Sequence, residues 1–159
     1  MTQEDKQLLL VDLCSRLPYS PFVQLMEKFD DEDSEHFREI HNLSTYDIEL
    51  FNSGEISNIK PFLRPMSSMT EEEQKILEDF GITISPFSGQ IHVPFDEINF
   101  PFITMQKIIS YLYSIHIDIN GLIEKGVAID ITEEEFDSLL IQLNSLKNDL
   151  ILADSETAE

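Results

Sequence analysis

Two prolines, Pro61 and Pro65, constrain the middle of the chain more than any other feature of the sequence. A proline has no backbone N–H to donate, and its ring fixes one backbone angle, so it interrupts a regular helix or a central β-strand. We therefore predict that residues 59–65 form an ordered connector. Phe62 and Leu63, which lie between the prolines, are predicted to pack inward.

A helix is predicted to follow this connector. Thr70 and Glu73 have the spacing of a capping box, in which the threonine hydroxyl accepts a hydrogen bond from a free helical N–H and the glutamate carboxylate accepts one from the threonine N–H. The helix is predicted to extend to Phe80, because Gly81 suits the left-handed position that follows a helix end.

The first helix is predicted over residues 3–16, where Thr2 caps its start and Pro18 ends it. Cys14 is expected to be a small buried side chain on the apolar face of this helix. As the only cysteine, it excludes an internal disulfide bond and a cysteine-based zinc site. The apolar face that helical spacing predicts consists of Leu10, Leu13, Cys14 and Leu17.

Three short strands are predicted between residues 22 and 51. Residues 22–26 are rich in β-prone side chains, and residues 37–43 carry apolar residues with a less regular alternation. Tyr46, Ile48 and Leu50 alternate with acidic residues, which is the pattern of a half-buried antiparallel strand. Beside the first helix, these strands predict a small antiparallel sheet, for which an SH3-like arrangement is one option.

The C-terminal half is predicted to be mainly helical, with a short hairpin over residues 82–98. Residues 101–116 are apolar almost all round, so this helix is expected to be a central one. Asp118 is predicted to cap the next turn, and residues 127–131 are predicted to include a brief extended segment.

A second capping box, formed by Thr132 and Glu135, predicts a last helix up to about residue 150. Residues 153–159 are expected to be a frayed acidic tail. The buried face predicted for this last helix consists of Phe136, Leu139, Leu140, Leu143, Leu146 and Leu150.

The predicted fold class is therefore α+β. Residues 1–65 are expected to form a helix with a small antiparallel sheet. Residues 66–152 are expected to form a mainly helical segment with a short hairpin, packed as one unit with the first.

The charge of the chain restricts its partners. The 31 acidic residues against 10 basic ones give a net charge of −21. Nucleic-acid and anionic-membrane surfaces are bound through Lys and Arg, so neither is an expected partner. A protein partner with a basic surface is favoured. The acidic N-terminus, the lone cysteine and the lack of an apolar run of membrane-spanning length predict a cytoplasmic protein.

The densest run of acids invites a calcium interpretation that its spacing does not support. An EF-hand loop needs a glycine at its sixth position and a glutamate at its twelfth, and neither register of this run supplies them. We interpret the run as a solvated loop and a candidate interaction surface. It contains Asp30, Asp31, Glu32, Asp33 and Glu35.

No motif of an enzyme is present in the sequence. The four histidines lack metal-motif spacing, the five glycines are dispersed, and no nucleophile motif occurs. We therefore predict a protein without catalytic residues, cofactor or metal.

Arg64, between Leu63 and Pro65, has two interpretations. It could clamp a carboxylate or phosphate in a pocket formed with Phe62 and Leu63. The favoured interpretation is an ion pair that ties the connector to an acidic helix.

Three segments carry a resemblance to a known family: residues 9–19 (LLVDLCSRLPY), 59–73 (IKPFLRPMSSMTEEE) and 117–127 (IDINGLIEKGV). In these segments the chain resembles a family of short, uncharacterised proteins of gut Bacteroidales, their phages and their mobile elements. The resemblance implies a genomic neighbourhood and supplies no catalytic residues.

Two hypotheses for function follow. The first is a non-enzymatic accessory protein of a phage or mobile element, which acts by protein–protein contact through its acidic surface or the exposed side of the last helix. In one version, the acidic face mimics DNA and occupies the basic groove of a host protein. The alternative is a small-molecule or peptide-binding module with a pocket at Phe62, Leu63 and Arg64.

Overall fold

The fold is known from a computed structural model that describes residues 1–28, 35–84, 91–92 and 102–132, and the single residues 135, 138 and 141. Helices and a small sheet alternate along it, which confirms the α+β class. The elements are α1 (Gln3–Arg16), η1 (Leu17–Tyr19), β1 (Phe22–Lys28), β2 (Glu35–Asn42), α2 (Thr45–Ser53), β3 (Asn58–Leu63), η2 (Met66–Ser68), α3 (Glu71–Asp79), β4 (Thr83–Ile84), β5 (Ile91–His92), α4 (Phe102–Ser114) and β6 (Ile129–Asp130).

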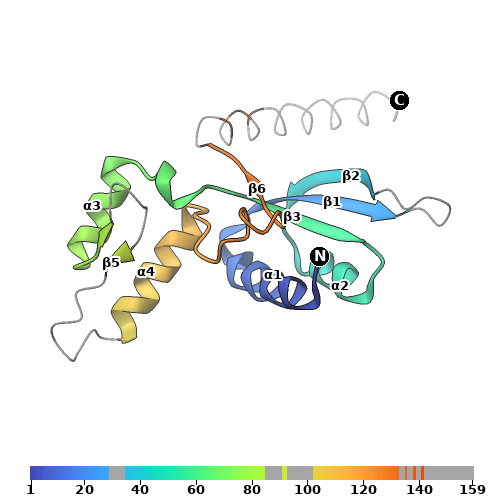
Figure 1. Cartoon of the computed structure of the whole chain (residues 1–159), viewed down its shortest axis with the longest axis horizontal. Coiled ribbons are helices and arrows are strands. Elements are labelled where there is room, and N and C mark those ends of the chain that lie inside the picture. Colours follow the sequence, from blue (N-terminus) through green and yellow to red (C-terminus); the bar gives the residue numbers. More distant parts are fainter. Residues whose placement is uncertain are drawn as a thin grey trace, which may run out of the picture.

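The main sheet has four strands in the order β2-β1-β3-β6 (Figure 1). β1 pairs antiparallel with β2, as predicted. It also pairs antiparallel with β3, which was predicted to be a connector, and β6 joins β3 in parallel, so the sheet is mixed. The all-antiparallel SH3-like option would not contain this parallel strand. A register shift between Leu25 and Met26 marks a bulge, which explains the irregular alternation of the second strand.

Pro61 lies inside β3, and β3 has a neighbouring strand on each side. This finding corrects the prediction that the prolines exclude a central strand. The Leu63 carbonyl accepts a hydrogen bond from the Ile131 N–H, so the backbone groups of Leu63 point toward β6. Backbone groups alternate in direction along a strand, and those of Pro61 therefore point to the same side. The described pairing of β6 reaches only Phe62 and Leu63, so no donor is needed at Pro61.

Helix α2 corrects the strand predicted around Ile48. Ser44 and Asp47 form a capping box: the Asp47 N–H donates to Ser44 Oγ at 3.4 Å, and the Ser44 N–H donates to Asp47 Oδ2 at 2.7 Å. Gly54 ends the helix in a left-handed conformation, with φ of 88°. These two end signals outweigh the short alternation between them.

Helix α1 buries a face that is rotated by about one residue from the predicted one. Cys14 is exposed, which corrects the expectation of a buried cysteine. The physical reason is an ion pair, because the charges of Asp12 and Arg16 compensate each other inside the protein. The residues that this helix buries are Leu9, Asp12, Leu13 and Arg16.

The elements form two lobes (Figure 1). The sheet lobe contains the four-stranded sheet with α1 and α2, and the helical lobe contains α3, α4 and the hairpin β4–β5. Leu63 packs into the core of the sheet lobe with α1, and Phe62 packs on the opposite face with Phe22 and Ile131. The inward packing predicted for Phe62 and Leu63 is therefore confirmed.

Helix α4 is only partly covered, which corrects the prediction of a central helix. Ile108 and Leu112 are buried against Leu77 of α3, but the exposed fraction is 75% for Phe102 and 64% for Ile103. The helix also has polar residues at helical spacing, which give it a second face. They are Gln106, Lys107, Ser110 and Ser114.

Several predicted ends are confirmed. Thr70 caps α3 in a full capping box, and the Thr132 N–H donates to Glu135 Oε2 at 2.9 Å. β4 pairs antiparallel with β5, as the predicted hairpin requires. The apolar face of the predicted last helix and the tail at 153–159 lie outside the described residues. No helix in the described part of the chain is long and apolar enough to cross a membrane.

Candidate functional site

A buried ion pair lies where the two lobes meet. Arg16 Nε donates to Asp12 Oδ2 at 2.6 Å, and Arg16 Nη2 donates to Asp12 Oδ1 at 3.2 Å. Arg16 Nη2 also donates to the Ile117 carbonyl at 2.8 Å, and the guanidinium lies 4.6 Å from the Tyr113 ring centre. Asn120 Nδ2 donates to Asp12 Oδ1 at 2.8 Å, so the carboxylate is shared between α1 and the segment after α4.

Arg64 ties the same segment to α3. Its N–H donates to the His116 carbonyl at 2.9 Å, and its carbonyl accepts from the Asp118 N–H at 2.8 Å. Its guanidinium donates to both Glu73 carboxylate oxygens, at 2.8 and 3.0 Å, and to the Ser68 carbonyl at 2.9 Å. The favoured interpretation of Arg64, an ion pair with an acidic helix, is confirmed.

His116 occupies a strained position between these two arginines. Its backbone is left-handed, with φ of 59°, which is unusual for a residue with a side chain. Burial, together with the positive charges of Arg16 and Arg64, lowers the pKa of His116 from 6.5 to about 4. The imidazole is therefore neutral at physiological pH.

These contacts define a polar junction, which consists of Asp12, Arg16, Arg64, Glu73, His116 and Asn120. Its members come from residues 9–19, 59–73 and 117–127, or lie next to these ranges in the chain. Asp12 and Arg16 have no exposed surface and Arg64 is 5% exposed, so a ligand cannot reach their charges. The arrangement can hold the lobes together.

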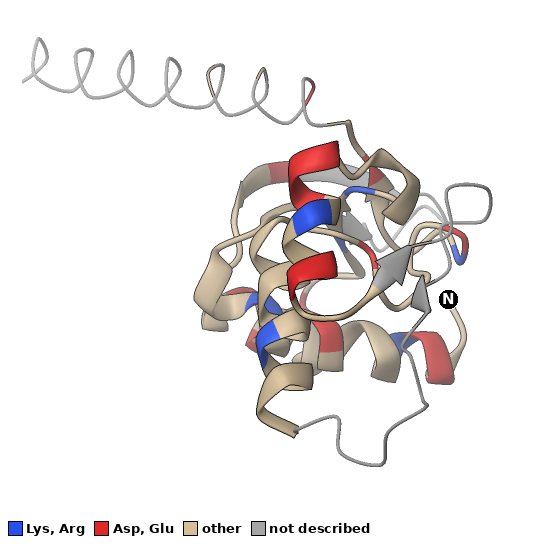
Figure 2. Cartoon of the chain, turned by 90° about the vertical axis from the view of Figure 1, so that its left-hand side faces the viewer, with Lys and Arg blue, Asp and Glu red and all other residues tan. Residues whose placement is uncertain are grey.

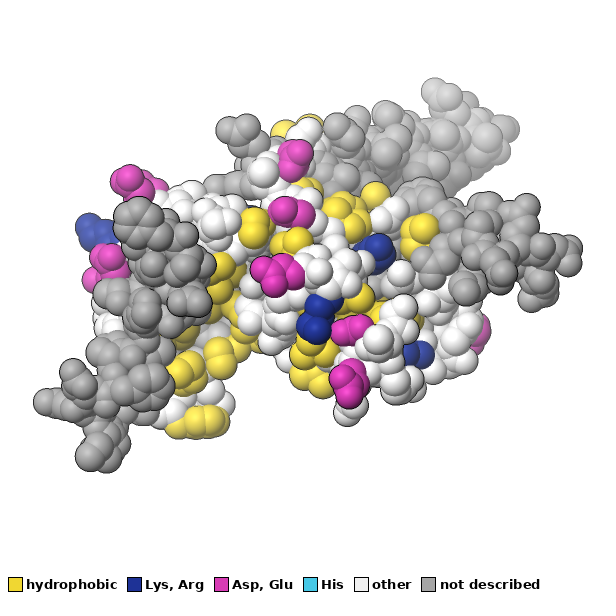
Figure 3. All heavy atoms as spheres, in the orientation of Figure 1, with side chains coloured by type: hydrophobic (Ala, Val, Ile, Leu, Met, Phe, Trp, Pro, Cys, Tyr) yellow, Lys and Arg dark blue, Asp and Glu magenta, His cyan; other side chains and the backbone are white. Residues whose placement is uncertain are grey.

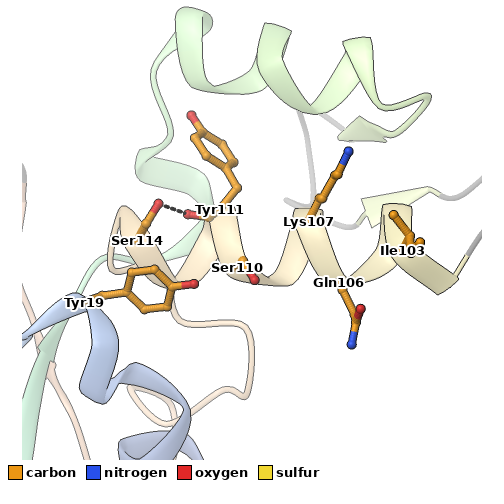
Figure 4. A pocket seen from close by; sticks show the side chains of 7 residues that line it. All are labelled: Tyr19, Ile103, Gln106, Lys107, Ser110, Tyr111 and Ser114. Atoms are coloured by element: carbon orange, nitrogen blue, oxygen red, sulfur yellow. Dashed lines mark hydrogen bonds between the residues drawn. The ribbon is translucent and has the colours of Figure 1, made fainter.

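A groove opens along α4 near the junction and has a volume of about 540 Å³ (Figure 4). Tyr19 of η1 extends along α4 toward Ser110, whereas Tyr111 and Lys107 point toward α3. The groove therefore takes residues from both lobes. Its lining consists of Tyr19, Ile103, Gln106, Lys107, Ser110, Tyr111 and Ser114.

Besides Ile103, which lines the groove, α4 exposes other apolar side chains. Figure 3 shows hydrophobic side chains gathered at the lower left, over α4. Among the apolar side chains of α4, Phe102 and Ile103 are the most exposed, and Ile109 is 37% exposed. We call these three residues and the groove lining the α4 face. Although the chain carries 31 acids, α4 contains none.

Acidic helix α3 flanks this face (Figure 4). Burial raises the pKa of Tyr111, and the Glu73 carboxylate adds to the effect, so the phenol remains a hydrogen-bond donor. Elsewhere, Asp and Glu positions are distributed over many elements, with few Lys and Arg positions among them (Figure 2). The exposed acids of α3 are Glu71, Glu72, Glu78 and Asp79.

The pocket residues proposed from the sequence do not line this groove. Phe62, Leu63 and Arg64 are engaged in packing and ion pairing, and the described groove is lined by other residues. Of the acidic run, only the backbone of Glu35 is described, at the start of β2. Asp30, Asp31, Glu32 and Asp33 lie outside the described residues.

A histidine–carboxylate pair occurs at the start of α2. His41 Nε2 lies 2.9 Å from Asp47 Oδ1, and Asp47 also accepts from the Ser44 hydroxyl at 2.6 Å. Desolvation opposes ionisation of Asp47, but hydrogen bonds from Ser44 and His41 lower its pKa overall. This carboxylate is committed to its helix cap. Within the described ranges, no group of three or more His, Cys, Asp or Glu residues is placed to hold a metal ion.

No protein family, curated protein or solved structure shows a significant match to this chain. Its function is therefore inferred from its own geometry.

The sequence did not predict the groove, because the many apolar residues between positions 101 and 116 indicated a central helix without a polar face. Gln106, Ser110 and Ser114 recur every four residues, which is the signal of a separate helix face. That signal could have predicted a two-faced helix. It could not have placed Tyr19 beside it, because that contact depends on how the lobes pack.

Proposed function

We propose that this chain is a non-enzymatic accessory protein that acts by protein–protein contact, with the α4 face as its contact surface. The observation that carries the proposal is the exposure of Phe102 and Ile103, at 75% and 64%, on a helix without acidic residues. Contact surfaces between proteins are enriched in aromatic residues and depleted of Asp and Glu. Contiguous exposed apolar patches are a feature of interaction sites, and the exposed apolar side chains of α4 support one here.

The net charge of −21 then has a separate role. A strong field accelerates the encounter with an oppositely charged partner and contributes less to the stability of the final complex. We propose that the acidic surface attracts a basic partner and that the α4 face holds it. A partner that is itself a nucleic-acid-binding protein would correspond to the DNA-mimic version.

The setting that we propose is the cytoplasm of a gut Bacteroidales cell, with the chain encoded by a phage or mobile element. The resemblance of the three segments supports this setting. The same α4 groove also supports a peptide-binding module as the alternative. Its volume lies within the range of small-molecule pockets, but it is open along a helix, which suits an extended partner segment better.

The proposal is tested by comparing three forms of the full chain as baits in a Bacteroidales lysate. The contact variant carries Phe102→Ser and Ile103→Ser. A matched control carries Val11→Ser and Tyr46→Ser, which remove exposed apolar side chains of α1 and α2 that are 59% and 62% exposed. All three forms should unfold at similar urea concentrations, because surface changes alter stability by only about 0.5 kcal/mol.

We expect a partner that is retained by the wild type and the control and is lost by the contact variant. Mass spectrometry of the retained proteins measures this difference. Retention of the same proteins by all three forms would show that the α4 face is not the contact surface.

A further inference from the structure

We propose that the α4 face binds a basic amphipathic helix of the partner, whose apolar stripe lies along α4 and whose Lys and Arg residues reach α3. This inference rests on the proposed function and specifies the chemistry of the partner. It is argued from the shape of the groove and from the distribution of charge around it.

The lining of the groove extends along most of α4, from Ile103 to Ser114. α4 contains 13 residues and is therefore about 20 Å long. Ser110 and Ser114 have short side chains that permit close approach of another backbone, and Tyr19 and Tyr111 flank them. An amphipathic helix of about 13 residues matches this length and places an apolar side chain once or twice per turn along the groove.

The charges on the two sides of the groove differ. The part of the groove formed by α4 carries Lys107 and no carboxylate, so a cationic side chain of the partner would find no ion-pair partner on α4. Helix α3, which packs on α4 through Leu77, exposes four carboxylates and one base, Lys75. The surface therefore presents a partly apolar groove on α4 next to a helix, α3, that carries exposed carboxylates. A basic amphipathic helix presents the complementary pair of faces.

A second copy of the chain fits this surface poorly. Each copy carries a charge of −21, and an isologous contact through the α4 faces would bring two acidic α3 helices toward each other. Like charges in juxtaposition oppose association. The complementary occupant is therefore a basic segment from another protein.

The test uses the full chain and a fluorescent synthetic helix of 14 residues made of Leu and Lys in amphipathic order. The comparison peptide has Glu in place of Lys and the same Leu stripe. Binding is measured by fluorescence anisotropy at two salt concentrations. The α3 variant carries Glu72→Gln, Glu78→Gln and Asp79→Asn, and its matched control carries Glu4→Gln, Glu49→Gln and Glu124→Gln, three exposed acids outside α3.

Both variants lose three negative charges, so they differ only in where the charge is removed. We expect the α3 variant to bind the Lys peptide about tenfold more weakly, with a smaller salt dependence, and the control to change by about twofold or less. The Phe102→Ser, Ile103→Ser variant should lose most of the binding, and the Glu peptide should not bind.

The outcomes separate this inference from the proposed function. Equal weakening by the α3 variant and its control overturns the basic-helix partner, while loss of binding in the contact variant would leave the α4 contact in place. Equal binding of the Lys and Glu peptides, or no binding of the Lys peptide, also overturns the basic helix. Unchanged lysate capture by the contact variant overturns the contact surface itself.

Discussion

Arg16 and Asp12 lie one helical turn apart in α1, and neither side chain is exposed to solvent. Each charge of this ion pair has further partners in the segment that follows α4, where Ile117 accepts a hydrogen bond and Asn120 donates one. Desolvation makes such a pair a weak source of stability when it is intact and a large cost when it is broken.

The substitution Asp12→Ala should lower the free energy of unfolding by about 3–5 kcal/mol, because it leaves the buried Arg16 charge without its carboxylate. The double substitution Asp12→Leu, Arg16→Met should cost less than the single one, since no unpaired charge remains. Urea unfolding followed by circular dichroism measures both. Lys125→Ala, which removes an exposed ion pair to Asp5, is the control and should cost less than about 1 kcal/mol. A double variant that is less stable than Asp12→Ala would contradict the prediction.

Stability should fall as the pH is lowered from 6.5 to 4, in part through His116. Its pKa is about 4 in the folded chain against an ordinary 6.5, so the unfolded chain binds a proton in this range that the folded chain does not. The contribution is complete above pH 6.5 and decreases toward pH 4, by at most about 3 kcal/mol. His116→Asn keeps a residue that tolerates the left-handed backbone and should flatten this slope. Urea unfolding across this pH range measures the slope, and an unchanged slope in the variant would exclude His116 as its source.

Substitution of Glu73 should lower the free energy of unfolding more than substitution of Thr70, its partner in the capping box. Thr70→Ala removes one side of the capping box and should cost about 1 kcal/mol. Glu73→Ala removes the other side and also the charge partner of Arg64, so we expect about 3 kcal/mol. Glu135→Ala, at the exposed cap formed with Thr132, is the matched control and should cost clearly less than Glu73→Ala. Thermal unfolding compares the three, and equal losses for Glu73 and Glu135 would argue against the double role.

The chain should not bind duplex DNA. Of its 10 basic residues, Arg16 and Arg64 are buried in the polar junction and cannot reach a phosphate. The net charge of −21 repels the duplex as well. A gel-shift titration at about 150 mM salt should therefore show no complex at micromolar protein, and a complex there would contradict the prediction.

Local signals in the sequence predicted the helix ends well. The capping boxes at Thr70 and Thr132 involve residues three apart, so the sequence alone contains both partners. Ser44 and Asp47 have the same spacing, but the short alternating pattern around Ile48 indicated a strand instead, and this prediction is wrong. A cap defined by specific hydrogen bonds is stronger information than five alternating residues.

The errors at Cys14 and Pro61 have a different origin, because their causes lie far away in the chain. Arg16 turns inward to reach a carbonyl 101 residues later, and this sets which face of α1 is buried. Pro61 is tolerated because β6, some 70 residues later, ends its pairing beside Phe62. No pattern within a short window contains either partner. The groove depends on the same kind of contact, since Tyr19 and α4 meet only in the folded chain.

The segment that contains residues 122–130 is synthesised after most of the chain, and this order affects folding on the ribosome. Leu122, Val127 and Ala128 complete the core that α1, β1 and β3 begin, and β6 is the last strand of their sheet. A nascent chain that ends before residue 120 therefore lacks part of its first core, and it also lacks Asn120, which binds Asp12. We expect the N-terminal half to remain incompletely folded until most of the polypeptide has been synthesised. Pulse proteolysis of stalled chains of increasing length should show protection of α1 only after residue 128 has left the exit tunnel.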